Sequence, residues 1–227
     1  MSIKSKLALV GERDLAKAAH QGIEASLALY RQSVGPLAFE WLGTATITPT
    51  TLAPFSGIWC VPGSPYESTA GALQAIQHAR LAQKPLLGTC GGFQHALVEY
   101  AQNVLAYDAQ HQELNPAAQN PLITRLSCSL VGTPQKVLTT APDFETLLGG
   151  TESLEEFNCN YGVNDELTAL FEGSSLAFVA CDEQHQRRAF QLQHHPFFIG
   201  TLFQPERRAL KEELHPLVRA FFQATTL

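Results

Sequence analysis

Cys90 stands out among the residues that could do chemistry, because glycines surround it where a strand is predicted to run into a helix. Residues 88–92 read GTCGG, after the apolar run 85–88 and before the helical pattern 93–104. Glycine lets the backbone take the strained angles of a tight turn. The N-terminus of a helix favours a thiolate, and the N–H group after the thiol can serve an oxyanion hole. The pattern indicates a cysteine nucleophile, although an incidental cysteine in a glycine-rich turn has the same spacing.

Strands and helices alternate along the first half of the chain, and they must position this turn. Short apolar runs predict strands at residues 6–10, 39–42, 57–61 and 85–88. Helical periodicity predicts helices at 15–32, 69–83 and 93–104, with Asp14 as a candidate N-cap for the first. This alternation is typical of a parallel, doubly wound sheet.

The second half of the chain predicts further strands around a polar, irregular stretch. Strands are expected at 126–131, 135–139, 174–179, 188–192 and 196–203, with a hairpin turn at 181–185 and a closing helix at 215–223. The sequence has no repeat, low-complexity stretch or linker, so we expect one domain over residues 1–227.

Composition and charge exclude several classes of function. Hydrophobic residues make up 45% of the 227 residues and charged residues 16%, and the net charge is −6, which argues against nucleic acid as a partner. The five cysteines are scattered and include no CxxC pair, so neither a disulfide framework nor a metal site is expected, and no cofactor is indicated. The N-terminal apolar run is too short for a signal peptide, and no run has the roughly 18 apolar residues of a membrane helix. We therefore expect a cytoplasmic protein without a membrane partner.

Four segments of the chain resemble one known family. They are 57–63 (GIWCVPG), 90–104 (CGGFQHALVEYAQNV), 195–198 (HPFF) and 203–206 (FQPE). The chain is similar to class I glutamine amidotransferase domains, and specifically to the glutaminase domain of CTP synthase. The resemblance covers nearly the whole chain and implies an α/β, flavodoxin-like fold with a mostly parallel central sheet and flanking helices. The synthetase domain that precedes this domain in CTP synthase has no counterpart in these residues.

The resemblance implies a role for several residues. In the family, a cysteine thiolate attacks the side-chain amide of glutamine, a histidine transfers the proton, and a glutamate orients the histidine. Cys90 matches the nucleophile, and Gly63 and Gly91 match the oxyanion-hole positions. Gln94 and Glu113 match residues that contact the substrate and its amine. The alternatives are turn glycines, a solvated helix start and a loop carboxylate.

Two positions depart from the family pattern. Gln204 occupies the place of the base histidine in the catalytic set, and a carboxamide does not titrate at neutral pH. Glu206 of that set is retained and could act as a base if burial raises its pKa. In residues 158–164 (NCNYGVN), Asn160 replaces the arginine that clamps the substrate carboxylate, next to Tyr161 in the expected substrate site. Ordinary glutaminase activity therefore becomes doubtful.

Other residues could supply the missing chemistry. Four histidines are candidates for a replacement base, against the alternative of solvated or structural roles: His95, His111, His194 and His195. Cys159, in the altered clamp segment, could meet Cys90 for redox chemistry.

Three functions remain open from the sequence. The first is a cysteine-dependent hydrolase or amidotransferase-like enzyme that uses a different base and an altered substrate. The second is a catalytically impaired relative that binds a small amide, an amino-acid-like ligand or a partner protein. The third is a true glutaminase subunit that delivers ammonia to a separate synthetase chain. The sequence does not indicate an oligomeric state.

Overall fold

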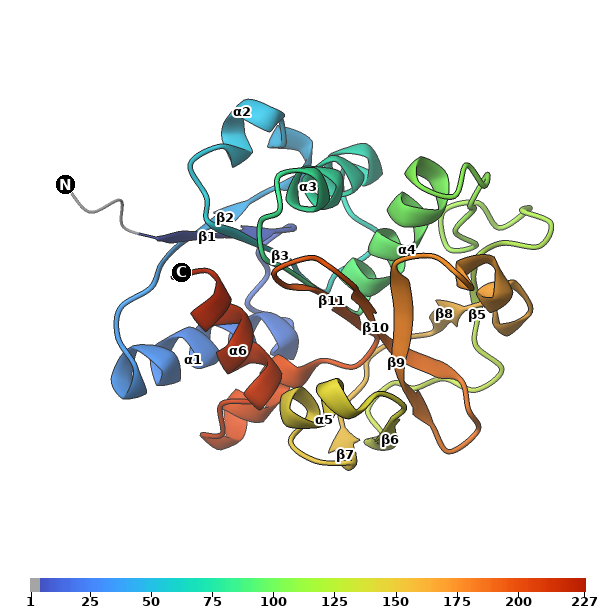
Figure 1. The fold of residues 1–227 in the computed structure, drawn as a ribbon. Coiled ribbons are helices and arrows are strands. Elements are labelled where there is room, and N and C mark those ends of the chain that lie inside the picture. Colours follow the sequence, from blue (N-terminus) through green and yellow to red (C-terminus); the bar gives the residue numbers. More distant parts are fainter. Residues whose placement is uncertain (1–4) are drawn as a thin grey trace.

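A nine-stranded mixed sheet forms the centre of the molecule, with helices on both faces (Figure 1). The computed structural model describes residues 5–227, so residues 1–4 of the segment considered as a signal peptide lie outside the described part. The strand order is β2-β1-β3-β4-β11-β10-β9-β6-β7. In chain order, these strands are β1 Lys6–Val10, β2 Ala38–Leu42, β3 Gly57–Cys60, β4 Leu86–Thr89, β6 Gln135–Thr139, β7 Glu152–Glu155, β9 Leu176–Asp182, β10 Arg187–Leu192 and β11 Phe198–Thr201. A separate antiparallel pair is formed by β5 Ile123–Arg125 and β8 Tyr161–Val163.

The two halves of the sheet differ in strand direction. From β2 to β11 every neighbouring pair is parallel, and from β11 to β7 every pair is antiparallel. Strands β3, β4 and β11 are buried along their whole length, as expected for parallel strands that are covered on both faces. The predicted α/β class is confirmed. The strand order reverses between β1 and β3, the point where open α/β sheets bind ligands at the carboxyl ends of their strands.

Helices cover both faces of this sheet. The α-helices are α1 Ala18–Ser33, α2 Pro49–Leu52, α3 Thr69–Leu81, α4 Gly91–Asn103, α5 Pro142–Leu148 and α6 Pro216–Ala224, and the short 3-10 turns are η1 Thr44–Thr46, η2 Asp165–Phe171 and η3 Pro205–Lys211. Helices α3 and α4 pack together on one face, and α1 and α6 lie on the other (Figure 1). Within the described residues, no helix is both long and apolar enough to span a membrane.

Two local predictions are wrong. Residues 126–131 do not form a strand, because the segment hydrogen-bonds irregularly with residues 157–160 through Leu126 N–H to Asn160 O and Leu130 N–H to Cys159 O. Asp14 does not cap α1, whose N-cap is Lys17. The carboxylate of Asp14 instead accepts a hydrogen bond from Ala16 N–H in the turn that precedes the helix.

Candidate functional site

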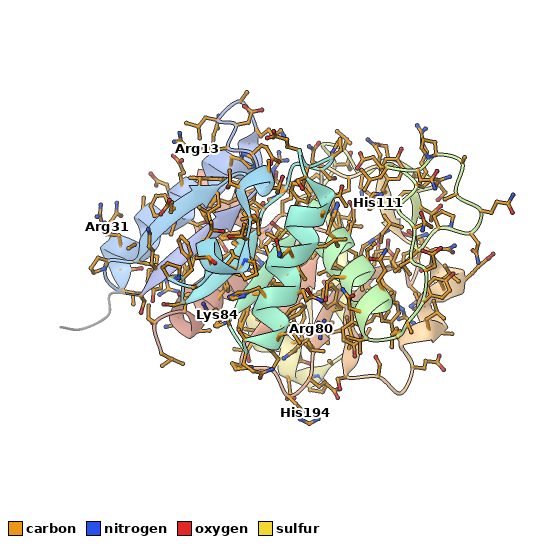
Figure 2. The ribbon with its side chains drawn as sticks, turned by 90° about the horizontal axis from the view of Figure 1, so that it is seen from above. Arg13, Arg31, Arg80, Lys84, His111 and His194 are labelled. Carbon is orange, nitrogen blue, oxygen red and sulfur yellow. The ribbon has the colours of Figure 1, made fainter. Side chains whose placement is uncertain are left out.

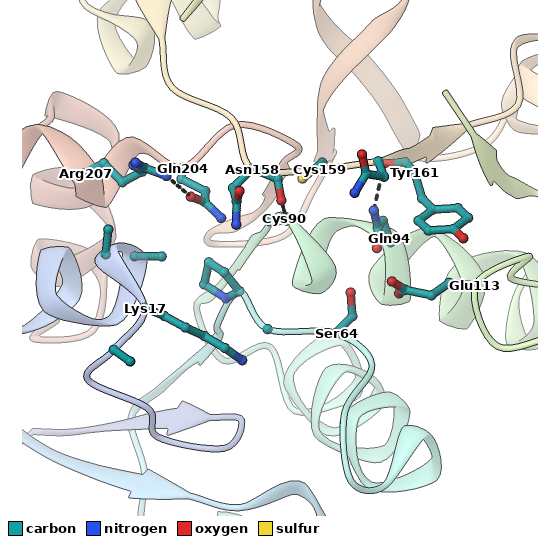
Figure 3. A pocket seen from close by; sticks show the side chains of 16 residues that line it. Lys17, Ser64, Cys90, Gln94, Glu113, Asn158, Cys159, Tyr161, Gln204 and Arg207 are labelled. Carbon is teal, nitrogen blue, oxygen red and sulfur yellow. Dashed lines mark hydrogen bonds between the residues drawn. The ribbon is translucent and has the colours of Figure 1, made fainter. Parts of the chain in front are cut away.

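A cavity of about 470 Å³ opens at the carboxyl ends of β1, β3 and β4. Seven of the predicted site residues line it, from five separate parts of the chain: Gly63, Cys90, Gln94, Glu113, Asn160, Tyr161 and Gln204. Gly91 lies directly beside Cys90 at the start of α4, and Glu206, which is fully buried, is not among the lining residues. The fold therefore brings together side chains that the sequence separates widely (Figure 3).

Cys90 sits on a strained turn between β4 and α4. Its backbone has φ 52° and ψ −104°, which an L residue adopts only when its surroundings impose it. Gly92 makes the turn feasible, because a Cβ there would lie 2.1 Å from the carbonyl oxygen of Cys60. The Cys90 N–H donates to Thr201 O at 2.8 Å, and its Sγ lies 3.8 Å from Asn158 O. The arrangement is that of a nucleophile elbow, with the sulfur at the N-terminus of a 13-residue helix.

Two backbone N–H groups are candidates for an oxyanion hole: that of Gly91, next to Cys90, and that of Gly63, which lines the same cavity. Gly91 starts α4, where N–H groups have no partner in the helix. Gly63 has φ 135°, a conformation that favours glycine, and its N–H has no hydrogen-bond acceptor among the described residues. His20 holds this turn in place: its Nδ1 accepts from Asp14 N–H at 2.9 Å, so its Nε2 donates to Pro62 O at 2.7 Å.

A fixed network holds Gln94 and Glu113 at one end of the cavity. Gln94 Nε2 donates to Tyr161 O at 2.8 Å, and its Oε1 lies 3.1 Å from His111 Nε2. His111 Nδ1 accepts from Glu113 N–H at 3.2 Å, so Nε2 carries the ring proton. Burial, and then the charge of nearby His95, lower the pKa of His111 to about 3, which keeps the ring neutral. One carboxylate oxygen of Glu113 is buried without a hydrogen-bond partner, and it is free to accept one from a cationic group in the cavity.

Gln204 lies at the other end of the cavity, on the far side of Cys90. Its Oε1 accepts from Arg207 Nη1 at 3.2 Å, and its amide nitrogen is directed into the cavity (Figure 3). The guanidinium of Arg207 also pairs with Glu156, at 2.9 Å. Gln204 can therefore donate a hydrogen bond to a group near Cys90, but it cannot remove a proton from the thiol.

Glu206 is fully buried just beyond Gln204, and neither carboxylate oxygen has a hydrogen-bond partner. Burial raises its pKa well above the ordinary value, and the charge of Cys90 acts in the same direction. Helix α1 packs closely against this segment, because a Cβ on Gly22 would lie 2.6 Å from the carbonyl oxygen of Glu206. The backbone that carries Gln204 and Glu206 is thus held by α1.

Residues 158–160 form the wall opposite the elbow. The Asn160 side chain accepts from Ser129 Oγ at 2.8 Å, so part of its hydrogen-bonding capacity is already used. Cys159 is buried, lines the same cavity as Cys90, and donates from Sγ to Leu202 O at 3.4 Å.

None of the four candidate base histidines lines the cavity. His95 is buried against Gly91 O at 2.8 Å, and burial lowers its pKa to about 4. His195 lies near Ala79 O, and His194 projects from the edge of the molecule (Figure 2). His111 approaches the cavity, but both of its ring nitrogens are engaged in the Gln94 network.

Among the residues that line the cavity, sequence reasoning missed four with polar side chains: Lys17, Ser64, Asn158 and Arg207. Each follows a strand end or a family segment. Lys17 follows strand β1, and Arg207 directly follows the segment FQPE. This position after a strand or a family segment is the only signal in the sequence that could have indicated these residues. The described residues contain no cluster of three or more His, Cys, Asp or Glu side chains that could hold a metal ion.

Comparison with known proteins identifies the family. The family model "Glutamine amidotransferase class-I" matches residues 45–224. CTP synthase of Campylobacter jejuni is 32% identical over 194 residues, which cover 74% of this chain and 35% of that protein. CTP synthase 2 of Xenopus laevis is 33% identical over 163 residues, or 66% of this chain and 28% of that protein. The chain thus spans about a third of the length of these relatives.

Solved structures agree on the fold. The glutaminase domain of Trypanosoma brucei CTP synthase with bound acivicin superposes with a TM-score of 0.86 at 17% identity, and the match covers 97% of this chain and 93% of that one. A glutamine amidotransferase from Thermotoga maritima has a TM-score of 0.62 at 13% identity, over 98% of each chain.

Proposed function

The chain belongs to the class I glutamine amidotransferase family, and we propose that it is a cysteine-dependent amide hydrolase that acts on a small amino-acid-like amide other than glutamine. The proposal rests above all on the strained Cys90 elbow, which is costly to fold and aims a thiol into a cavity with free backbone donors. We assign the reaction to the cytoplasm.

In this mechanism, the Cys90 thiolate attacks the carbonyl carbon of the amide. The N–H groups of Gly63 and Gly91 receive the developing oxyanion, and Glu113 binds the substrate amine. The tetrahedral intermediate collapses as its C–N bond breaks, and the leaving nitrogen takes a proton from solvent and departs as ammonia or an amine, which leaves a thioester. Water then adds to the thioester carbonyl, the C–S bond breaks, and the acid product leaves with the Cys90 thiolate restored. Gln204 donates a hydrogen bond at the reacting centre in place of a proton-transferring histidine.

An altered substrate is favoured by the change in charge around the cavity. Asn160 is neutral and already bonded to Ser129 at the place where the family resemblance puts an arginine. The cations that do line the cavity, Lys17 and Arg207, approach it from the opposite side to Glu113 (Figure 3). A substrate that carries its anionic or acceptor group toward Lys17 suits this cavity better than glutamine does.

Gln204 also favours a second candidate, a binding module that retains the ligand site without turnover. Because general acid–base catalysis contributes roughly 10²- to 10⁴-fold, loss of the histidine could leave the thiol reactive but the cycle slow.

Two measurements separate the candidates. Intact mass after treatment with an amino-chloroketone analogue of glutamine reports whether Cys90 reacts from the occupied site, and ammonia release from a panel of amino-acid amides reports turnover. Release that disappears in Cys90→Ala but not in Cys181→Ala supports the hydrolase. Adduct formation without release from any amide supports the binding module. Absence of both adduct and release overturns the assignment of a reactive site.

A further inference from the structure

Cys90 and Cys159 come together at the end of strand β11. The Cys90 N–H donates to Thr201 O at 2.8 Å, and the Cys159 thiol donates to the carbonyl of the next residue, Leu202, at 3.4 Å. The Cys90 sulfur also lies 3.8 Å from the carbonyl oxygen of Asn158, the neighbour of Cys159. Both side chains line the same cavity.

The other cysteines lie in different surroundings. Cys60 is buried and has the hydroxyl of Tyr66 at 3.5 Å, Cys181 belongs to β9, and Cys128 is exposed on the 126–131 segment. Among the described cysteines, only Cys90 and Cys159 line this cavity.

We propose that Cys90 and Cys159 are a reversible dithiol–disulfide pair, in which a hydroperoxide oxidises Cys90 and Cys159 resolves the product. This inference goes beyond amide hydrolysis and does not depend on it. It assigns to Cys159 a role that the family resemblance does not.

The two sulfurs differ in a way that suits these roles. The start of α4 favours negative charge on Cys90, so Cys90 makes the first attack. Burial raises the pKa of Cys159 well above its ordinary value, and the hydrogen bond and charge of Cys90 act in the same direction. The Cys159 thiol therefore keeps its proton and does not compete with Cys90 for the peroxide, and it lines the same cavity as the sulfur that it must attack.

The reaction has two balanced steps. First, the Cys90 thiolate attacks a peroxide oxygen: an S–O bond forms, the O–O bond breaks, and the leaving alkoxide or hydroxide takes up a proton, which leaves a sulfenic acid. Second, the Cys159 sulfur attacks Cys90: the S–S bond forms, the S–O bond breaks, and hydroxide leaves with the Cys159 proton as water. Two thiols are oxidised to a disulfide and one peroxide is reduced. An external dithiol reverses the change.

Oxidation has a structural consequence. A disulfide would tie residues 158–160 to the nucleophile elbow and remove Cys90 from the cavity as a nucleophile. The pair would also protect Cys90 from irreversible oxidation, because the sulfenic acid is consumed before it reacts with more peroxide.

The test uses the full chain with Cys128→Ser as the parent, to prevent disulfides between molecules through the exposed thiol. The parent is treated with stoichiometric hydrogen peroxide, alkylated and analysed by intact and peptide mass spectrometry. We expect loss of two hydrogen atoms, a peptide that joins Cys90 to Cys159, and full recovery with dithiothreitol. Cys181→Ser serves as the matched buried control and should form the same crosslink.

Cys159→Ser supplies the discriminating result, because serine can keep the hydrogen bond to Leu202 O. In this variant Cys90 should gain one or more oxygen atoms instead of forming a disulfide. Oxygen addition in the parent without a crosslink, or a crosslink through Cys60, overturns the proposal. Equilibration of the parent with glutathione buffers gives a second readout that needs no change at position 159. The outcome is separate from the amide panel, since a dithiol pair can form whether or not ammonia is released.

Discussion

Glu113 presents a buried, unpartnered carboxylate oxygen to the cavity, and this predicts how strongly the site discriminates between reagents. The change Glu113→Gln removes the negative charge and preserves the shape. A charge-assisted hydrogen bond contributes about 1.5–3 kcal/mol, which corresponds to roughly 10- to 100-fold in affinity. Alkylation of Cys90 by an amino-chloroketone analogue of glutamine, which carries an amine, should slow by about that factor.

The assay compares two reagents on the same variant by intact mass. Iodoacetamide has no amine, so its rate of reaction with Cys90 should not change in Glu113→Gln. Glu166→Gln, an exposed carboxylate away from the cavity, is the matched control and should leave both rates unchanged. The free energy of unfolding of Glu113→Gln should not fall, because the affected oxygen has no partner to lose. Equal slowing of both reagents, or no slowing of the chloroketone, would refute the assignment of Glu113 to the ligand amine.

Three further substitutions test the framework of the site. Arg80 donates two hydrogen bonds, of 2.6 and 3.0 Å, to the fully buried carboxylate of Glu99. Arg80→Ala removes both, so the free energy of unfolding measured by urea denaturation should fall by about 3–5 kcal/mol. Glu206→Gln should raise the free energy of unfolding at neutral pH. Because the pKa of Glu206 is raised in the folded chain, the folded chain keeps a proton that the unfolded chain loses, and the stability of the wild type falls as pH rises above 4.5. The variant has no carboxyl group at this position and should lack that decline. Gly92→Ala places a methyl group 2.1 Å from Cys60 O and should cost about 1–3 kcal/mol or more, with slower alkylation at the elbow.

Arg80→Ala and Gly92→Ala each have a matched control variant, and Glu206→Gln is compared with wild type. Arg13→Ala breaks an exposed pair with Glu24 and should cost less than about 1 kcal/mol. In Gly91→Ala the new methyl group meets Ser64 Cβ, Oγ and N at 3.0, 3.1 and 3.2 Å, which is less severe than 2.1 Å, so this variant should be tolerated better than Gly92→Ala. Equal losses within either pair, or parallel pH profiles for Glu206→Gln and wild type, would contradict the corresponding reasoning.

Local sequence patterns were sufficient to predict several strands of the fold. The strand at residues 6–10 and the strand at 135–139 were predicted at their observed bounds, because short apolar or β-branched runs end at clear turn residues. Residues 126–131 have a similar composition, but their N–H groups bond to a loop rather than to a strand. Composition alone does not reveal that partner, because the partner lies about thirty residues further along the chain.

The candidate site was predictable where a motif was local. The glycines around Cys90 indicated the elbow, whereas the proton position on His111 depends on Gln94 and on the N–H of Glu113 together. The approach of Cys159 to Cys90 depends on two strand ends that meet only in the folded chain. Such tertiary relationships leave no periodicity in the sequence.

The close packing of Gly22 against the carbonyl of Glu206 has an evolutionary consequence. Through this contact, helix α1 constrains the backbone of the segment that begins at Gln204. The contact does not involve the side chain at position 204. Side chains that fit the buried space beside Arg207 can therefore replace Gln204 without a change in this backbone packing, whereas any side chain at position 22 would displace the segment. A lineage could exchange one chemistry for another at 204 by a single codon change while position 22 stays fixed.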